Sequence, residues 1–384
     1  MGRVAVAKEV LRWAVGRSEL AVDDLRDRFP KIQEWFTGKT QPTLRQLEEL
    51  AKATLTPLGF LFLEKPPDER LPVPHYRTAG TEGVARPSPE LIETVRAMQR
   101  RQDWMSEFLV EEGQEALSFV RSAKRDDQPG AIAERMRSAI GFGEQWAAEH
   151  RTWTDALRAL REALENAGIL VVVNGILGNN THRRLDPEEF RGFVLVDEYA
   201  PLLFVNGTDG KAAQMFTLAH ELAHVFLGQS AAFNLREMQP AREPIEQICN
   251  QAAAEFLVPG RLLSGIWPAV RKQQEPFQVI ARQFKVSALV GARRALDLDL
   301  IRKDEFLAFY REYLKDERRF ARPAKRGGNF FTSQDLRVGR RFASTVMRAA
   351  REGRLTYSEA YDLTGLYGKT YHRYAAKLGI ERPA

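Results

Sequence analysis

Three residues in a short apolar run have the types and the spacing of a catalytic metal site. His220, Glu221 and His224 lie in FTLAHELAHVFLG (Phe216–Gly228) and form the pattern H-E-x-x-H. Histidines four residues apart share one face of a helix, about 5–6 Å apart at Cβ, so both rings can reach one Zn²⁺. The Glu221 carboxylate beside them could take a proton from a water whose pKa the zinc lowers to about 7. The pattern predicts a zinc hydrolase with His220 and His224 as ligands and Glu221 as general base and then proton donor.

The residues around this pattern indicate a buried helix. The neighbouring positions are almost all small or apolar, and Gly228 is a typical helix end. Two histidines and a glutamate inside such a helix need partners, which a metal ion would provide. The alternative is a core helix with two structural histidines, which would bind no metal.

A catalytic zinc site needs a third protein ligand and an open position for water. In the metzincin pattern the third ligand would be a histidine six residues after His224, but Ser230 stands there. We therefore expect the ligand on a second helix, predicted for EPIEQICNQAAAEFLVP (Glu243–Pro259).

This second helix offers two candidate carboxylates. Glu246 lies four residues before Asn250, so that the two share one face, while Glu255 lies near the end of the helix. Glu243 is better explained as a residue of the first helical turn. Spacing alone leaves Glu246 and Glu255 as alternatives.

The two helical motifs, together with the run from Asn174 through Asn206, resemble the ImmA/IrrE family of bacterial zinc metallopeptidases. The resemblance covers most of the chain and is to the longer form, which has an N-terminal XRE-like helix-turn-helix. It implies that the third ligand is the glutamate four residues before the asparagine, which is Glu246 before Asn250. It also implies a thermolysin-like gluzincin arrangement.

The resemblance further implies a function. Known members cleave transcriptional repressors and so relieve the repression of stress-response or mobile-element genes, and others occur beside toxin genes that include PIN-like nucleases. By this resemblance we expect a zinc-dependent, site-specific endopeptidase that cleaves a partner protein, a repressor or an antitoxin-type regulator. The alternative is a DNA- and partner-binding regulator, or an antitoxin of a nuclease toxin, with a structural or vestigial zinc site.

Composition agrees with a multi-domain protein of the cytoplasm. The chain has 384 residues, of which 44% are hydrophobic and 28% charged, enough for two or three cores. No apolar stretch approaches the length of about 18 residues needed to span a membrane, and the N-terminus lacks the apolar region of a signal peptide. The single cysteine, Cys249, excludes an internal disulfide and is expected to be a small buried residue.

The expected fold class is α+β and mainly helical. We predict a gluzincin-like metallopeptidase core with a small sheet, flanked by helical N- and C-terminal domains. The predicted division is an XRE-like domain over residues 1–65, a Pro-rich linker over 66–90, the peptidase domain over 91–310 and a basic helical domain over 311–384.

The first of these domains departs from the XRE pattern. Pro30–Leu63 resembles its later half, with Thr43 as the cap of a helix. The stretch between Leu20 and Trp35 is several residues too short for a second helix and a full recognition helix. A docking or substrate-recognition scaffold is therefore favoured over DNA binding here.

Short apolar runs in the peptidase region predict strands. The runs are Gly168–Asn174, Arg191–Asp197 and Ala200–Asn206, and the last two suggest a hairpin. We expect this hairpin to receive the substrate backbone by β-augmentation. Helical patterns are predicted for residues 89–108, 128–141, 154–167 and 275–301, the last as two helices around a turn at Lys285–Ser287.

His182 and Tyr199, two residues in loops beside the predicted strands, are candidates for stabilising the transition state. A neutral histidine or a tyrosine can donate a hydrogen bond to the oxyanion that forms when water attacks a peptide carbonyl. Asn250 on the second metal helix is a third candidate for contact with the substrate. The alternative for His182 and Tyr199 is an ordinary surface position.

The basic character of the chain is concentrated at its C-terminal end. From Arg311 onward there are 17 Lys and Arg against 8 Asp and Glu, whereas the preceding residues carry 40 against 43. Three helices are expected between Asp335 and Gly379, with a turn near Gly365–Gly368. The third helix could enter the major groove of DNA. The alternative is a helical cap on the peptidase. The candidate DNA contacts are Lys369, Tyr371, His372, Arg373 and Lys377.

Overall fold

The computed structural model describes residues 2–18, 20, 22–69, 75–77, 87–234, 243–315 and 330–380. The chain forms two compact units. The first comprises residues 1–72 and 81–96, and the second comprises residues 73–80 and 97–384. The second unit contains every residue of the predicted metal site.

The first unit is a small helical domain around its own apolar core. Thr43 caps the fourth helix as predicted, since its side chain accepts from the N–H of Gln46 in a capping box. A buried ion pair joins Arg17 Nη2 to Glu69 Oε1 at 2.8 Å. The third helix has only six residues, in line with the shortness predicted for this region. The elements are α1 (Lys8–Arg17), α2 (Val22–Arg28), α3 (Ile32–Thr37), α4 (Leu44–Thr54) and the 3₁₀ helix η1 (Leu58–Phe62).

The second unit is built on a five-stranded mixed sheet with the order β1-β5-β3-β4-β2. The three predicted strands are present as β2, β3 and β4, and the hairpin of β3 and β4 is antiparallel as expected. The strands β1 and β5 lie where none was predicted. The bounds are β1 (His75–Arg77), β2 (Leu170–Asn174), β3 (Gly192–Leu195), β4 (Leu202–Asn206) and β5 (Ala231–Asn234).

This order bears on the expectation that the hairpin receives the substrate backbone by β-augmentation. Gly192 pairs with Val205 of β4 on one side and with Phe233 of β5 on the other. Both strands of the hairpin are therefore interior, and their backbone groups are already used in the ladders. β-Augmentation of β3 or β4 would require a neighbouring strand to leave.

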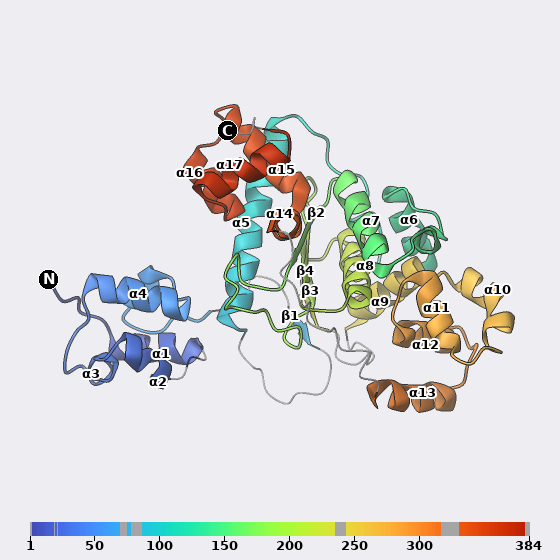
Figure 1. The fold of residues 1–384 in the computed structure, drawn as a ribbon, viewed down its shortest axis with the longest axis horizontal. Helices are drawn as coiled ribbons and strands as arrows, with labels where there is room; N and C mark the ends of the chain where they lie inside the picture. The colour runs from blue at the N-terminus through green and yellow to red at the C-terminus, as the bar shows by residue number, and fades with distance from the viewer. Residues whose placement is uncertain are drawn as a thin grey trace. The chain divides into compact units, whose positions relative to one another are not determined.

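Helices cover both faces of the sheet, so every residue of β2, β3 and β4 is buried. Figure 1 shows α7 and α8 on one side and α5 on the other. Side chains alternate along a strand, so Val194 packs in the apolar core that contains the buried residues of α8, while Phe193 points to the opposite face of the sheet. There the ring of Phe193 stacks on Phe204 at 4.8 Å. Gln102 of α5 closes that face by donating to the carbonyls of Leu195 and Ala200, at 2.7 and 3.0 Å.

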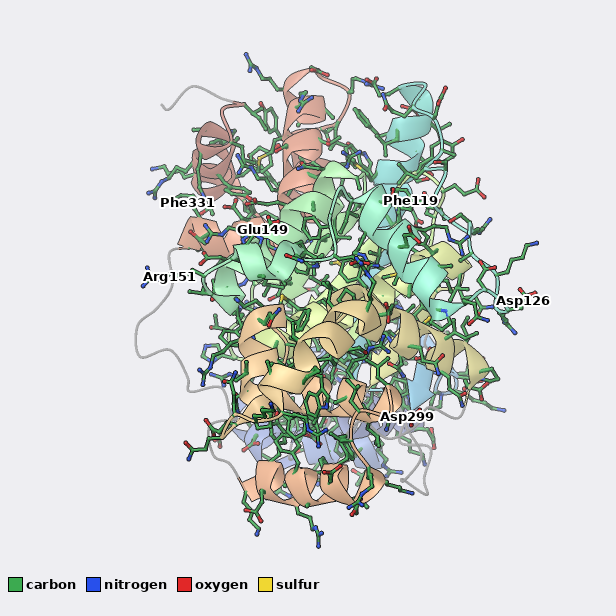
Figure 2. All side chains as sticks on the ribbon, turned by 90° about the vertical axis from the view of Figure 1, so that its right-hand side faces the viewer. Phe119, Asp126, Glu149, Arg151, Asp299 and Phe331 are labelled. Carbon is green, nitrogen blue, oxygen red and sulfur yellow. The ribbon has the colours of Figure 1, made fainter. Side chains whose placement is uncertain are left out.

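The helices of the second unit follow the predicted pattern and add elements that were not predicted. The helix α5 begins in the first unit and continues into the second. Lys285, with φ 55°, and Val286 lie between α11 and α12, as expected for a turn there. Asp299, labelled in Figure 2, lies between α12 and α13. The elements not predicted are η2, α10 and α13. The bounds are α5 (Pro89–Glu111), α6 (Pro129–Ala139), η2 (Trp146–Glu149), α7 (Trp153–Asn166), α8 (Lys211–Leu227), α9 (Pro244–Leu257), α10 (Gly260–Val270), α11 (Pro276–Phe284), α12 (Ala288–Asp297) and α13 (Lys303–Lys315).

The C-terminal helices belong to the same compact unit as the sheet. Gly339, at φ 83°, lies so close to β2 that a side-chain carbon here would meet Val171 O at 2.9 Å. Two residues later, the backbone N–H of Arg341 donates a hydrogen bond to the Glu165 carboxylate at 3.2 Å. Figure 1 shows α14 and α15 beside β2 and α5. The bounds are α14 (Phe330–Gln334), the π turn η4 (Asp335–Gly339), α15 (Arg340–Arg351), α16 (Tyr357–Thr364) and α17 (Gly368–Lys377).

The fold class is confirmed, since the structure is mainly helical with a small sheet at its centre. The division into four domains stays a prediction, because residues 311–384 cluster with residues 97–310 in one unit and parts of the predicted linker lie outside the described residues. Among the helices that the structure describes, none combines the length and the apolar character that crossing a membrane requires.

Candidate metal centre

The helix α8 holds His220, Glu221 and His224 inside the core. All three are completely buried, as expected from the apolar residues around them. The helix ends at Gly228, whose φ of 74° is left-handed and whose N–H donates to His224 O at 2.8 Å. A side chain at this glycine would run into Arg121. The predicted helix end is therefore confirmed, and it fixes the last turn that carries the second histidine.

The helix α9 brings Glu246 to the two histidines. Glu246 Oε2 lies 3.2 Å from His220 Nε2, and Glu246 Oε1 lies 3.1 Å from His224 Nε2. The two Nε2 atoms are themselves 3.1 Å apart. A tetrahedral zinc with bonds of about 2.0–2.1 Å separates its ligand atoms by roughly 3.3 Å, so the spacing of the two Nε2 atoms and the Glu246 oxygens suits one ion. The structure thus brings together the three residues that were predicted to bind the metal.

Glu255, the other candidate ligand, is engaged elsewhere. Its carboxylate forms an ion pair with Arg294 and accepts from the N–H of Gly260 at 3.2 Å, at the start of α10. Glu255 therefore serves the packing of α9 against α10 and α12. Of the two carboxylates that spacing left as alternatives, Glu246 is the one that lies beside the histidines.

Asn250 faces a histidine. Its side-chain oxygen lies 3.0 Å from Nδ1 of His220, one helical turn beyond Glu246. As an amide oxygen can only accept, the neutral His220 ring carries its proton on Nδ1 and presents a lone pair at Nε2. This contact orients His220, and the expectation that Asn250 contacts the substrate stays a prediction.

The side chain of Glu221 lies on the face of α8 that packs against β3, next to Gly192. A side-chain carbon on Gly192 would come within 3.3 Å of Glu221 Oε1 and 2.5 Å of Thr217 Cγ2. Neither oxygen of Glu221 has a hydrogen-bond partner among the described residues. Burial, followed by the nearby charge of Glu246, raises the pKa of Glu221 well above its ordinary value.

The charges of this site are incomplete without a cation. Burial by itself would raise the pKa of Glu246, but its contacts with the rings of His220 and His224 hold the pKa below its ordinary value, so this carboxylate is ionised. Burial lowers the pKa of His220, which favours the neutral ring. Acceptor atoms from His220 and Glu246 thus converge beside a second buried carboxylate, Glu221. Such an arrangement is costly unless a positive ion balances it, so the donor set fits a divalent metal such as zinc.

For the two residues predicted to stabilise the transition state, the structure describes no contact with this centre. His182 is exposed in the turn between β2 and β3, where its N–H donates to Asn180 Oδ1 at 3.1 Å. Tyr199 lies in the turn between β3 and β4, and its N–H donates to Asp197 Oδ1 at 2.9 Å. The oxyanion role of both residues stays a prediction.

Cys249 is completely buried on α9. Burial, together with the charges of Glu246 and Glu221, raises its pKa well above the ordinary value, so the thiol is protonated. The expectation of a small buried residue agrees with this position.

The candidate DNA contacts in the C-terminal segment differ in their exposure and in their partners. Lys369, His372 and Arg373 are exposed on α17. Tyr371 is completely buried, so its assignment to base edges is wrong: it lies on the core side of the same helix. Lys377 is exposed but donates to Asp335 Oδ2 at 2.9 Å, which ties it to η4.

Sequence reasoning missed Gly192 as a residue of the site. A signal was available, because a glycine at the start of an apolar strand often marks a close approach of the backbone to a neighbour. The orienting role of Asn250 was also missed, although its spacing from Glu246 already placed both residues on one face.

Two stretches of the chain match known family models. Residues 164–296 match the IrrE N-terminal-like domain, a peptidase family, and residues 338–377 match a domain of unknown function, DUF8813. No curated protein and no solved structure matches the chain. The first match runs from the end of α7 to α12 and contains all four residues discussed above as ligands or base. It supports the resemblance to the ImmA/IrrE family for this part of the chain.

Proposed function

We propose that this chain is a zinc-dependent endopeptidase that cuts a specific partner protein. The observation that carries the proposal is the convergence of His220, His224 and Glu246 at mutual distances of 3.1–3.2 Å with Glu221 buried beside them. The match of residues 164–296 to a peptidase family supports the same reaction class.

In this mechanism the chain's own residues orient groups and move one proton. Bound zinc would supply a Lewis acid that polarises the scissile carbonyl and lowers the pKa of water to about 7. The orientation of His220 is fixed by Asn250, which keeps the proton on Nδ1 and the lone pair on Nε2. Glu221 accepts the proton of the attacking water at a carboxylate oxygen and then delivers it to the nitrogen of the leaving amine.

The substrate we propose is a transcriptional repressor or an antitoxin-type regulator. This finer statement rests on the ImmA/IrrE resemblance, which the family match supports for the catalytic region. A protease that recognises one folded partner need not cut a general substrate such as casein, because most of its specificity comes from contacts outside the scissile bond.

The test compares Glu221→Gln with the wild type in cells that also express the proteins encoded beside it. New protein N-termini, surveyed by mass spectrometry, are expected with the wild type and should be absent with Glu221→Gln. Both proteins should carry one zinc per chain by elemental analysis. Glu149→Gln, at an exposed position on η2, is the matched control and should behave as the wild type. The same new N-termini in Glu221→Gln, or no stoichiometric metal in the wild type, would refute the proposal.

The competing function is a regulator or antitoxin whose zinc is structural. It would bind DNA or a nuclease toxin and would need no proton transfer. In that case no cleavage appears with either protein, and Glu221→Gln retains repression or co-purification of the nuclease at the wild-type level. Loss of cellular function in Glu221→Gln with zinc still bound favours the peptidase.

A further inference from the structure

The C-terminal helices α16 and α17 have the dimensions of a helix-turn-helix. The helix α16 ends at Thr364, and Gly365 follows with a left-handed φ of 67°. Leu366 is buried in the turn, and α17 starts at Gly368. A turn of about three residues with a glycine is typical of the DNA-binding motif, in which the second helix enters the major groove.

The two faces of α17 differ sharply. Tyr371, Tyr374 and Ala375 are completely buried and hold the helix to the rest of the domain. Tyr374 donates to Asp335 Oδ1 at 2.7 Å, which fixes the helix against η4. The outer face must then carry the polar residues, since buried and exposed positions alternate with the helical period.

The outer face of α17 is cationic. Lys369, His372 and Arg373 are exposed and stand at i, i+3 and i+4, so they share one stripe. The helix contains no Asp or Glu, and residues 330–380 carry nine Lys and Arg against four Asp and Glu. The Arg373 guanidinium lies 5.5 Å from the ring centre of Phe331, which is labelled in Figure 2.

We infer that α17 is a recognition helix for duplex DNA, with Lys369 and Arg373, in the first two turns of the helix, on phosphates or base edges. The inference concerns the segment that matches only a domain of unknown function, and it does not depend on the peptidase. It corrects the contact set predicted from the sequence, since Tyr371 is buried and Lys377 is held by Asp335.

The acidic residues of α16 do not cancel this charge. Glu359 is part of the capping box and accepts from the N–H of Thr356 at 2.9 Å. Asp362 accepts from the hydroxyl of Tyr367 at 3.3 Å. Both carboxylates are therefore held on α16, while the cationic stripe lies on α17.

Duplex DNA is favoured over a single strand because the stripe is helical and its side chains are long. A single strand is bound mainly by bases that stack on exposed aromatic rings. The exposed rings of residues 330–380 are Phe330 of α14, Tyr357 at the start of α16 and Tyr367 in the turn. None of them belongs to α17, although the ring of Tyr357 lies 5.6 Å from that of His372. The phosphates of a duplex instead require cations on a helix that fits the groove.

The experiment measures binding of the full chain to a fluorescent duplex of random sequence by anisotropy over a range of salt concentrations. The variant Lys369→Ala/Arg373→Ala should bind about tenfold or more weakly, and the slope of log Kd against log salt should fall by roughly two. The matched control is Lys303→Ala/Arg271→Ala, two exposed cations of which one lies on α13 and the other directly after α10. It should bind as the wild type, and circular dichroism should show that both variants are folded.

Three results would overturn the inference. The first is no binding of the duplex by the wild type at low salt. The second is equal binding by the variant with Lys369 and Arg373 replaced and by the wild type. The third is tighter binding of a single strand of the same length, which would assign the surface to single-stranded nucleic acid instead. Glu221→Gln should bind the duplex as the wild type does, so loss of peptidase activity and loss of DNA binding are separable.

Discussion

The side-chain oxygen of Asn250 lies 3.0 Å from Nδ1 of His220, while Nε2 of the same ring faces Glu246 at 3.2 Å. One helix, α9, thus supplies both a metal-ligand candidate and the group that orients its histidine partner. The four-residue spacing between Glu246 and Asn250 allows both side chains to reach α8 from successive turns. The site is therefore a property of two packed helices and not of the histidine motif alone.

Removing the Asn250 amide should weaken metal binding. Asn250→Ala leaves Nδ1 of His220 without its acceptor, so the tautomer and the ring orientation are no longer fixed. We expect the zinc Kd to rise by about 10–100-fold, because partners of ligating histidines typically contribute that much. A competition titration with a chromogenic chelator measures it. Asn250→Asp keeps an acceptor and should retain tight binding, and Gln251→Ala, exposed on the same helix, should not change the Kd. An unchanged Kd in Asn250→Ala would rule out the orienting role.

The two glutamates of α9 should respond in opposite ways to substitution. Glu246→Gln removes a ligand charge, so we expect loss of stoichiometric zinc with a folded protein. Glu255→Ala leaves the buried Arg294 without its carboxylate partner, which should lower the free energy of unfolding by about 3 kcal/mol while zinc stays bound. Elemental analysis and urea unfolding distinguish the two. Zinc lost in Glu255→Ala but retained in Glu246→Gln would reverse the ligand assignment.

The sequence predicted the elements whose signals are local. The H-E-x-x-H spacing, the helix end at Gly228 and the strands at residues 170–174, 192–195 and 202–206 depend on short runs of residues and appear as expected. Glu246 could not be separated from Glu255 by spacing, because the difference lies in Arg294, more than thirty residues away. The two glutamates are distinguished only by the packing of α9, which brings Glu246 to the histidines of α8 and Glu255 to Arg294 of α12.

Predictions that depended on the neighbours of an element were less successful. The hairpin of β3 and β4 was expected to receive a substrate strand, but β5 and β2 already pair with its outer edges, and β5 comes from a four-residue run with little strand signal. Tyr371 was assigned to DNA because it lies in a basic segment, yet the helical period turns it toward the core. In both cases the residue types predicted the element correctly, but they did not predict which neighbours it packs against.

Gly192 should be intolerant of a side chain. A methyl group here would meet Thr217 Cγ2 at 2.5 Å and Phe204 O at 2.7 Å, and Glu221 Oε1 lies 3.3 Å away. Gly192→Ala must therefore push β3 away from α8 and displace Glu221, so we expect kcat on the cognate protein to fall at least tenfold with zinc still bound. Gly210→Ala is the matched control, because nothing lies within 4 Å of a side-chain carbon there. Wild-type kcat in Gly192→Ala would show that the proton carrier does not depend on this contact.

Removal of the metal should destabilise the second unit. Without a cation, the carboxylate of Glu246 lies against the lone pair of His220 in a buried site, and its charge acts on the buried Glu221. Zinc at about 1,000 times its Kd would add roughly 4 kcal/mol to the free energy of unfolding. Calorimetry of protein treated with chelator and then reloaded with zinc should show a lower and then a restored Tm. The double variant His220→Ala/His224→Ala should show no change in Tm on adding zinc, and a shift as large as that of the wild type would place the metal elsewhere.

Arg101 should hold the C-terminal helices to α5. Its Nε donates to Leu363 O at 2.9 Å and its Nη1 donates to Arg337 O at 3.0 Å, so one side chain joins α5 to α16 and to η4. Burial, aided by the charge of Arg100, lowers the pKa of Arg101 to about 10, which still leaves it protonated at neutral pH. Because the lowered pKa favours the neutral form in the folded state, stability should increase with pH only as the pH approaches 10, and this contribution should be constant between pH 6 and 8.

Arg101→Ala therefore leaves two carbonyls without donors, and we expect the free energy of unfolding to fall by about 2 kcal/mol. Limited proteolysis should cut the variant faster within residues 330–380, because the loss concerns the attachment of these helices. The matched control is Arg100→Ala, since Arg100 is the exposed neighbour on the same helix, and it should be cut at the wild-type rate. Faster cutting of both variants to the same extent would show that loss of positive charge on α5, and not the two carbonyl contacts, holds the C-terminal helices in place.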